Sequence, residues 1–356
     1  MAILNILTRV FWNQDEKRVR ALWRLAIHAV LFMMLTSFIT VGLTVLAALF
    51  RLASGTRLRD VLGVNDLTTL INAPYATMVI APLAAFLGVL GATFFAGKWL
   101  DCRPFKAFGF IFSKRWWQDF AFGLGLGALL MGLIFLVGWL TGSIHVTGFF
   151  KAFNQDISFF WGFLQALFFF ILVGIYEELL SRGYHLVNLA EGFNGRLFGE
   201  RGALILAYLV SSLAFGLLHL GNPNATWVSG VNIAMAGVFL GLGMVLTGSL
   251  AIPIGLHITW NFFQGTVFGF AVSGIRTGAT LIATEATGPA WLTGGNFGPE
   301  AGLLGLGAML IGCVLIIFWV RWKGKLALAE ELAVYEPRIN RADYQIQSDT
   351  PNLAAD

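Results

Sequence analysis

Long apolar runs separated by short polar connectors dominate the chain. A helix needs about 20 apolar residues to cross the hydrocarbon core of a bilayer. Runs of roughly that length lie at 25–50, 73–97, 119–142, 158–182, 202–220, 229–247, 250–270 and 301–321. The pattern predicts an all-α, polytopic integral membrane protein with about eight transmembrane helices.

Less apolar segments border this block of helices at both ends. Residues 1–24 combine Trp12 and Trp23 with basic side chains, a mixture that is typical of the membrane–water interface. Residues 322–356 are polar with only scattered apolar positions. We therefore divide the chain into an interfacial segment at 1–24, a membrane domain at 25–321 and a polar tail at 322–356. We expect the first and last of these to be cytoplasmic.

Composition and charge agree with this division. The chain is 57% hydrophobic and 12% charged, whereas a soluble globular protein is about 25% charged. The net charge of +4 could indicate a nucleic-acid partner, as could the bases and aromatic residues interleaved at 98–118. However, if the amino terminus is cytoplasmic, 18 of the 23 Lys and Arg residues fall in cytoplasmic segments. This is the positive-inside distribution, so the basic residues indicate topology and we expect no nucleic-acid partner.

Few ionisable side chains interrupt the apolar runs, and charges at membrane depth are costly and usually functional. The set consists of His28, Glu177, Glu178, Arg182, His219 and His257. On a helix, Glu178 and Arg182 are four residues apart and can form an ion pair. Glu177 points about 100° away from Glu178. The spacing therefore predicts one carboxylate neutralised by an arginine, in a structural or positioning role, and one left free for chemistry.

The two histidines come from other predicted helices. His219 ends the fifth apolar run, and His257 lies inside the seventh, where it shares a helical face with Asn261. A glutamate and a histidine that converge can activate a water molecule as general base. A second histidine and an asparagine amide can donate hydrogen bonds to a developing oxyanion. These are the parts of an amide hydrolase that has no nucleophilic side chain.

Each residue also has a structural interpretation when it is taken alone. Glu178 and Arg182 can be a structural ion pair, His219 an interfacial histidine, and His257 with Asn261 an interhelical hydrogen bond. Glu177 can be a proton-relay residue in a transporter. A single protein needs only one of these features and this chain has them all, which favours a site that they form together.

The same residues, in this order and spacing, resemble the signature of a known family. The CPBP family of intramembrane endopeptidases, also called the Abi or type II CAAX prenyl endopeptidase family, has three motifs that match Glu177-Glu178-x-x-x-Arg182, Phe215-x-x-x-His219 and His257-x-x-x-Asn261. The signature region covers roughly 160–270. Flanking stretches, including Thr293-Gly-Gly-Asn-Phe-Gly-Pro-Glu300, resemble bacterial members of the family.

The resemblance implies a function and a role for each motif residue. In the family, the residues that match Glu177 and His219 are assigned to water activation, and those that match His257 and Asn261 to the oxyanion hole. The expected protein is an intramembrane endopeptidase of the bacterial inner (plasma) membrane, with the lipid bilayer and a membrane-associated peptide or protein substrate as its partners. Two alternatives remain. They are a non-catalytic immunity or scaffold protein of the same family and, ranked last because no inverted repeat is visible, a proton-coupled transporter.

A cofactor is the remaining question. Glu177, His219 and His257 could hold zinc, with an open position for water. Zinc sites normally need neighbouring groups that orient each imidazole. The nearby candidates, Asn222 and Asn261, are amides, and Glu178 is expected to be occupied by Arg182. We therefore favour metal-free water activation with zinc as the alternative.

One further expectation concerns depth. Because Glu177 comes late in the fourth apolar run while His257 lies in the middle of the seventh, we expect the fourth helix to continue to about residue 190.

Overall fold

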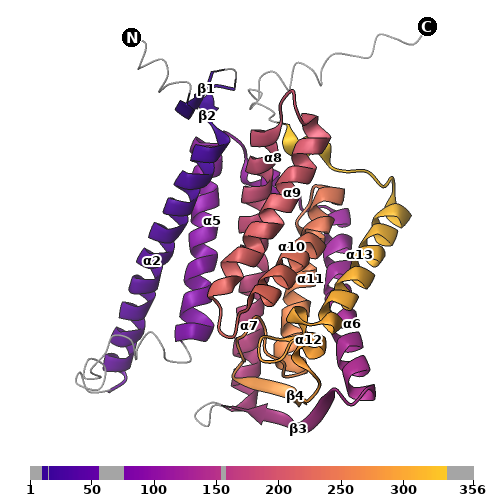
Figure 1. Cartoon of the computed structure of the whole chain (residues 1–356). Helices are drawn as coiled ribbons and strands as arrows, with labels where there is room; N and C mark the ends of the chain where they lie inside the picture. Colours follow the sequence, from indigo (N-terminus) through magenta and orange to yellow (C-terminus); the bar gives the residue numbers. More distant parts are fainter. Residues whose placement is uncertain (1–9, 15, 56–75, 154–157, 335–356) are drawn as a thin grey trace.

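The protein is a bundle of long helices (Figure 1). The computed structural model describes residues 10–14, 16–55, 76–153 and 158–334. The long helices are α2 (Ala21–Ala53), α5 (Ala81–Trp99), α6 (Lys114–Leu140), α7 (Phe159–Glu178), α9 (Gly199–Leu218), α10 (Trp227–Thr247) and α13 (Leu303–Lys323), and α11 (Ala251–Phe262) is shorter. Two short helices, α8 (Val187–Phe193) and α12 (Ala290–Thr293), complete the set that Figure 1 labels.

Seven helical stretches of the described chain are long and apolar enough to cross a membrane. Their outward faces carry large apolar side chains, such as Phe38 and Phe50 on α2 and Leu129 on α6, which are largely exposed. A surface of this kind is stable against lipid and not against water. The predicted class, a polytopic all-α integral membrane protein, is therefore confirmed.

The stretch 250–270 differs from the predicted seventh span. Helix α11 has only 12 residues and continues as a π-helical turn at Phe263–Val267. Ten of its 12 residues are buried, and it packs against α6, α7 and α10 rather than lipid. Because protein surrounds this helix, bilayer thickness does not set its length. Among the described residues, the bundle thus has seven helices of membrane-spanning length and one shorter helix in its centre.

Glycines allow the central helix to approach its neighbours closely. A Cβ atom on Gly123 or Gly127 of α6 would lie 2.5 and 2.3 Å from Ile252 O and Thr259 Oγ1, respectively. On α7, a Cβ atom on Gly174 would lie 3.0 Å from the backbone nitrogen of Ile258. Small residues at such contacts are typical of helix packing in membranes. The contact of α7 with α11 is one turn before the two glutamates and directly beside His257.

Helix α7 continues well past its last α-helical residue. A π-helical stretch at Leu179–Leu186 joins it to α8, so that Phe159–Phe193 forms one apolar helix of 35 residues. The predicted extension to about residue 190 is confirmed. Glu177 lies 18 residues after Phe159 and 16 before Phe193, near the middle of the helix. The π-helical stretch contains Arg182, and such stretches occur frequently at functional sites.

Two antiparallel strand pairs were not predicted. The short pair is β1 (Trp12–Asn13) with β2 (Arg18–Val19), and the longer is β3 (Ile144–Ala152) with β4 (Ala279–Ala286). In the longer pair Ile144 lies opposite Ala286 and Lys151 opposite Thr280, with one register shift between Val146 and Gly148. A search for long apolar runs overlooks strands of this length.

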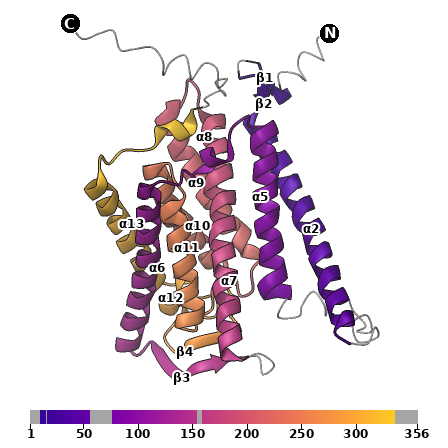
Figure 2. The same cartoon turned by 180° about the vertical axis from the view of Figure 1, so that it is seen from behind.

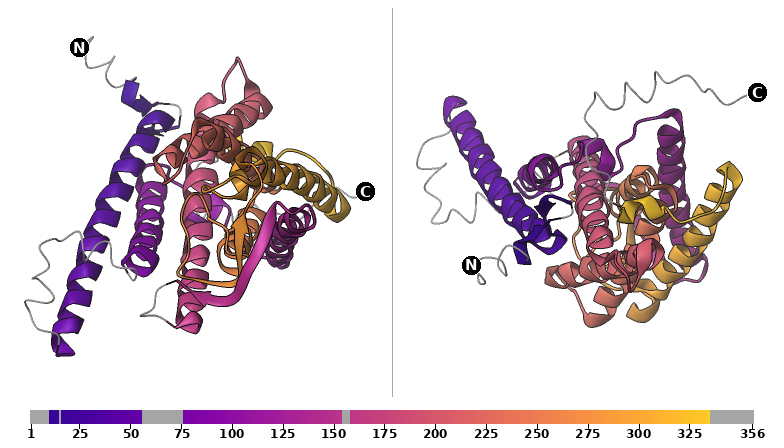
Figure 3. Two further views of the ribbon diagram at one scale, coloured as in Figure 1. Left: turned by 60° about the horizontal axis from the view of Figure 1, so that its bottom comes forward. Right: turned by 90° about the horizontal axis from the view of Figure 1, so that it is seen from above.

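The two strand pairs lie at opposite ends of the bundle. Figures 1 and 2 show β1–β2 at one end, together with the end of α13, and β3–β4 at the other. The first and last described segments thus lie on the same side, and whether that side is cytoplasmic stays a prediction. Helix α2 packs mainly against α5, and Figure 3 shows this pair beside the remaining helices.

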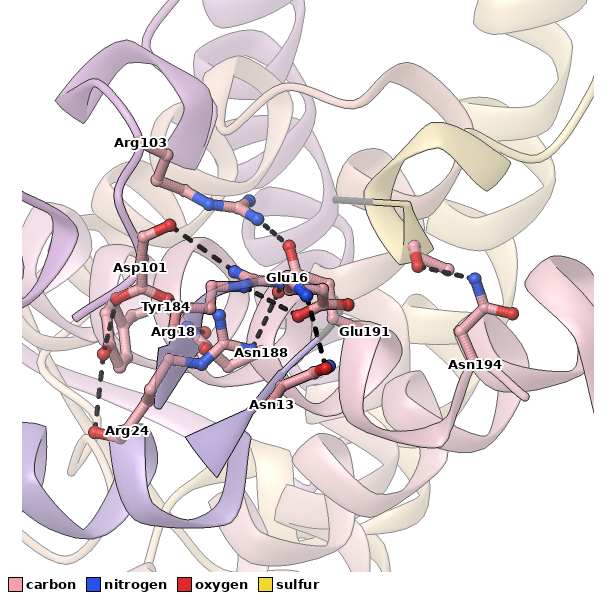
Figure 4. Close-up of polar contacts among 11 residues, drawn as sticks. Asn13, Glu16, Arg18, Arg24, Asp101, Arg103, Tyr184, Asn188, Glu191 and Asn194 are labelled. Carbon is pink, nitrogen blue, oxygen red and sulfur yellow. Dashed lines mark hydrogen bonds and ion pairs between the residues drawn. The ribbon is translucent and has the colours of Figure 1, made fainter. Parts of the chain in front are cut away.

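A cluster of buried charges fixes the N-terminal segment to the bundle (Figure 4). This arginine cluster consists of Arg18, Arg24, Asp101, Arg103 and Glu191. Glu191 Oε2 lies 2.8 Å from both Arg18 Nη2 and Arg24 Nη2, and its Oε1 pairs with Arg103. Asp101 pairs with Arg24 through Oδ1 at 3.4 Å and accepts a hydrogen bond from the Tyr184 hydroxyl through Oδ2 at 2.8 Å.

Candidate active site

Glu178 is the central acceptor of the candidate site. Its Oε1 lies 3.0 Å from Arg182 Nη1, so the ion pair predicted from their spacing is confirmed. The same oxygen lies 2.8 Å from His257 Nδ1, a contact that joins α7 to α11. Glu178 is fully buried, and Arg182 also donates a hydrogen bond to Gly237 O at 3.1 Å. The carboxylate therefore holds an arginine and a histidine at once.

Glu177 lies at the meeting point of the two histidines. Its Oε2 is 4.0 Å from His219 Nε2 and 3.9 Å from His257 Nε2. That oxygen is buried and has no hydrogen-bond partner, while Oε1 accepts a long hydrogen bond of 3.4 Å from the Tyr176 hydroxyl. The Glu177 side chain is 20% exposed, in contrast to Glu178. One carboxylate is thus held in place by the protein and the other faces open space.

The backbone orients the His219 ring. Its Nδ1 lies 2.7 Å from Phe215 O, one turn back along α9. A carbonyl only accepts, so Nδ1 carries a proton and the neutral ring presents a lone pair at Nε2. That lone pair faces Glu177 Oε2 across the 4.0 Å gap. The Phe215 ring, 4.5 Å from the His219 ring between centroids, also covers the Arg182 guanidinium at 4.4 Å.

All four predicted catalytic residues line one cavity of about 370 Å³. Glu177, His219, His257 and Asn261 contribute to its wall, and Asn261 lies one turn after His257 on α11. The remainder of the wall is largely apolar, with Phe170, Val173, Ile233, Phe239, Leu240 and Met309 among its residues. The structure thus brings the predicted residues together, whereas their chemical roles stay predictions.

His219 meets Glu177 although it follows the last residue of α9. Helix α9 ends at Leu218, and His219 begins a single 3-10 turn that ends at Gly221. Figure 1 shows α9 starting beyond most of the bundle and ending well short of β3–β4. The end of α9 is therefore close to the middle of the long helix that carries Glu177. The end of the fifth apolar run thus meets the middle of the fourth, as convergence of His219 and Glu177 requires.

The argument from sequence against zinc had one wrong premise. We expected pairing with Arg182 to make Glu178 less available to a histidine, but a carboxylate oxygen has two lone pairs and Glu178 Oε1 engages both residues. A carboxylate behind an imidazole is a common arrangement at zinc sites.

The distances nevertheless do not fit zinc as they stand. The separations of 4.0 and 3.9 Å exceed the ~3.4 Å between two ligands of a tetrahedral ion with ~2.1 Å bonds. Within the described ranges, no group of three or more His, Cys, Asp or Glu residues has the geometry to hold a metal ion.

Glu300 also lines the cavity, and the sequence analysis did not propose it as a site residue. It belongs to a 3-10 turn at Pro299–Ala301, just before α13, and is almost completely buried. Burial raises the pKa of its carboxyl to about 7, although hydrogen bonds from Ser273 and Gln264 act in the opposite direction. Our search considered only ionisable residues inside apolar runs, so a buried glutamate in a connecting segment was outside it.

The fold and the cavity define an integral membrane protein with a polar site enclosed by its helices. Residues 159–263 match the family model described as type II CAAX prenyl endopeptidase Rce1-like. All seven motif residues, from Glu177 to Asn261, lie within the matched segment, and the family resemblance is confirmed there. No curated protein and no solved structure matches the chain. Because the matched family is one of proteases, the match supports a peptidase.

Proposed function

We propose that this protein is an intramembrane endopeptidase that hydrolyses a peptide bond of a membrane-associated protein or peptide. The observation that carries the proposal is the position of Glu177 Oε2. This buried oxygen lacks a hydrogen-bond partner, faces the imidazoles of His219 and His257, and lies at the wall of a cavity. A buried polar atom without a partner is costly, and enzymes tolerate such atoms where a substrate or a water molecule will bind.

In this proposal, Glu177 and His219 activate the attacking water. The gap between Glu177 Oε2 and His219 Nε2 separates two acceptors, which cannot bond to each other but can each accept one hydrogen of a water molecule. The water oxygen then attacks the scissile carbonyl carbon while one of its protons moves to Glu177. His219 accepts a hydrogen bond from the second hydrogen of the water and thereby directs the water lone pair.

The oxyanion of the tetrahedral intermediate is stabilised by His257 and Asn261. Both residues lie on one face of α11, and Asn261 can donate through Nδ2. His257 already donates from Nδ1 to Glu178, so donation from Nε2 as well requires the imidazolium form of the ring. Glu177 and Glu178 lie on either side of this ring and balance its charge. When the intermediate collapses, the proton held by Glu177 moves to the departing amine, and the carbon–nitrogen bond breaks.

The proposed mechanism does not involve a metal ion. It needs only the proton acceptors and donors that line the cavity, and the separations around Glu177 match a bridging water better than zinc coordination. The apolar wall, with Phe170, Val173 and Phe239, suits a substrate segment that enters from lipid rather than a polar peptide from water.

The proposal is tested in two stages. Membrane proteomes of cells that contain either the wild-type protein or its Glu177→Ala variant are compared to find fragments that depend on Glu177. A peptide spanning a cleavage site found in this way is then incubated with the purified protein in liposomes. We expect cleavage by the wild type and by the Glu285→Gln control, whose exposed carboxylate lies on β4. Equal fragment patterns in the two proteomes would contradict a peptidase and favour the scaffold alternative.

A further inference from the structure

A second polar cluster contributes Glu300 and Ser273 to the wall of the cavity. Its centre is Glu300, whose Oε1 accepts hydrogen bonds from the backbone nitrogen of Ser273 and, at 3.3 Å, from Ser273 Oγ. Glu300 Oε2 accepts a close hydrogen bond from Gln264 Nε2. Gln264 also donates to Ala271 O at 2.6 Å. The carboxylate thus links the turn at Ser273 to the π-helical turn that follows α11.

This turn is strained and needs a support of that kind. Ser273 has a φ of +47°, in the left-handed region that non-glycine residues rarely adopt. Its neighbour Gly274 has a φ of +83° and touches the backbone of Pro223, where a Cβ atom would lie 1.8 Å from Pro223 O. Gly274 N also donates to Phe297 O at 2.7 Å. The turn is therefore clamped between the segment that carries Glu300 and the segment that follows α9.

The clamp leads directly to His219. Asn222 Nδ2 donates to Ser273 O at 3.2 Å, and Asn222 N donates to His219 O at 3.1 Å. Because α9 ends at Leu218, regular helical hydrogen bonds no longer hold the chain beyond His219. The position of the His219 ring therefore depends on how the turn after it is anchored. Asn222 supplies that anchor, and Glu300 holds the turn to which Asn222 binds.

We propose that Glu300 and Asn222 are positioning residues that hold His219 at hydrogen-bonding reach of the water activated by Glu177. The expected effect on catalysis rests on the proposed peptidase function. The expected effect on the position of His219 rests only on the contacts described above. Glu300 lines the same cavity, but both of its oxygens already accept hydrogen bonds from Ser273 and Gln264. Its contacts with Ser273 lead through Asn222 to His219, so we assign it a positioning role.

The catalytic consequence is measured with single and double variants. We expect Glu300→Ala and Asn222→Ala each to lower kcat between about ten- and a hundred-fold, because small displacements of catalytic groups have effects of that size. KM should change less than about two-fold, because substrate binding by the apolar wall is retained. The double variant should be no worse than the more damaging single one, since both break the same link. Glu300→Gln keeps an oxygen for Ser273 N–H and should recover part of kcat, whereas Glu285→Gln is the matched carboxylate control.

The structural consequence is measured without any substrate. Diethyl pyrocarbonate modifies accessible histidine nitrogens, and peptide mapping by mass spectrometry gives the ratio of modified His219 to modified His257. This ratio should rise at least about two-fold in Glu300→Ala and Asn222→Ala and stay unchanged in Glu285→Gln. Asn222 is only half-buried, so its variant keeps the test valid if Glu300→Ala does not fold.

The two readouts separate this inference from the proposed function. An unchanged modification ratio in Asn222→Ala, or additive losses of kcat in the double variant, would overturn the positioning role even if the wild type cleaves peptides. A changed ratio in a protein that cleaves nothing would support the positioning of His219 and refute the peptidase.

Discussion

Buried arginines and carboxylates occur at two places in this protein, and the two places differ in what the charges face. In the arginine cluster, every oxygen of Asp101 and Glu191 lies beside an arginine or accepts a hydrogen bond from Tyr184. In the cavity cluster, formed by Glu177, Glu178, Arg182, His219 and His257, the ion pair of Glu178 is equally buried. Glu177, however, faces a cavity and two histidines across gaps of about 4 Å.

The difference shows how a structural charge is distinguished from a chemical one. Burial alone does not separate them, because Arg24 and Arg182 are both almost inaccessible. The surroundings of the carboxylate do. The carboxylates of the arginine cluster are enclosed by arginines and Tyr184, whereas Glu177 Oε2 has no arginine partner and lies at the wall of a cavity between two histidines. Glu178 combines both situations, since it belongs to an ion pair and also orients His257.

The largest effect is expected for Glu177→Gln, which removes the base but preserves the shape of the side chain. We expect kcat to fall by about 10²–10⁴-fold, the usual contribution of general acid–base catalysis. The thermal unfolding midpoint in detergent should not fall, because no ion pair with an arginine is lost. Cleavage of a reconstituted peptide and unfolding monitored by tryptophan fluorescence provide the two measurements. If Glu177→Gln cleaved the peptide at the wild-type rate, Glu177 would have a structural role, as the carboxylates of the arginine cluster have.

The opposite result is expected for Glu191→Gln in the arginine cluster. This variant leaves three buried arginines without their shared carboxylate, and removing one partner from a buried ion pair costs about 3–5 kcal/mol. We expect a lower unfolding midpoint and looser attachment of the N-terminal segment, seen as faster proteolysis near Trp12. The kcat per folded molecule should stay within about two-fold of the wild type. A specific loss of kcat with unchanged stability would show that the cluster takes part in catalysis.

The comparison also explains which features could be predicted from the sequence. Spacing along one helix determined the Glu178–Arg182 pair, and apolar runs of sufficient length located the membrane spans. The contact between Glu178 and His257 could not be predicted, because it depends on how closely α7 approaches α11 at Gly174. The depth of His219 relative to Glu177 could not be read from the apolar run for a similar reason. It depends on where α9 begins relative to its neighbours.

The arginine cluster and Glu300 were missed because their partners are far apart in the sequence. Arg24 meets Glu191, 167 residues away, and Glu300 meets Ser273 across a connection with no long apolar run. Neither pair has a spacing that a helix or strand would predict. Sequence motifs therefore identified the residues that point into the cavity, whereas the residues that hold those side chains in position became visible only in three dimensions.

A buried carboxylate with only neutral partners is expected to make stability depend on pH. The pKa of Glu300 is raised from 4.5 to about 7 by burial. The folded state therefore binds a proton that the unfolded state releases between these values, so this contribution to stability is complete below about 4.5 and is lost as the pH rises through about 7. A pKa difference of this size corresponds to about 3 kcal/mol.

Glu300→Gln stays neutral at every pH and provides the reference. We expect the wild type to lose thermal stability relative to this variant between pH 5 and pH 8, as measured by the unfolding midpoints of both proteins in the same detergent. Parallel curves for the two proteins would mean that Glu300 is ionised in the folded state at both pH values. It would then resemble the carboxylates of the arginine cluster.

The smallest effect is expected from removal of metal ions. Glu177, His219 and His257 are residue types that bind zinc, and Glu178 lies behind His257 as it would in a zinc site. The separations around Glu177 instead match a bridging water, as the proposed mechanism requires. Treatment with a chelator followed by desalting should therefore change kcat by less than about two-fold, with bound metal measured by mass spectrometry on the same samples. Activity that disappears on chelation and returns with one equivalent of zinc would reassign Glu177 from proton acceptor to metal ligand. The two clusters would then differ in what neutralises their carboxylates. A metal ion from solution would neutralise Glu177, whereas arginines of the chain neutralise Asp101 and Glu191.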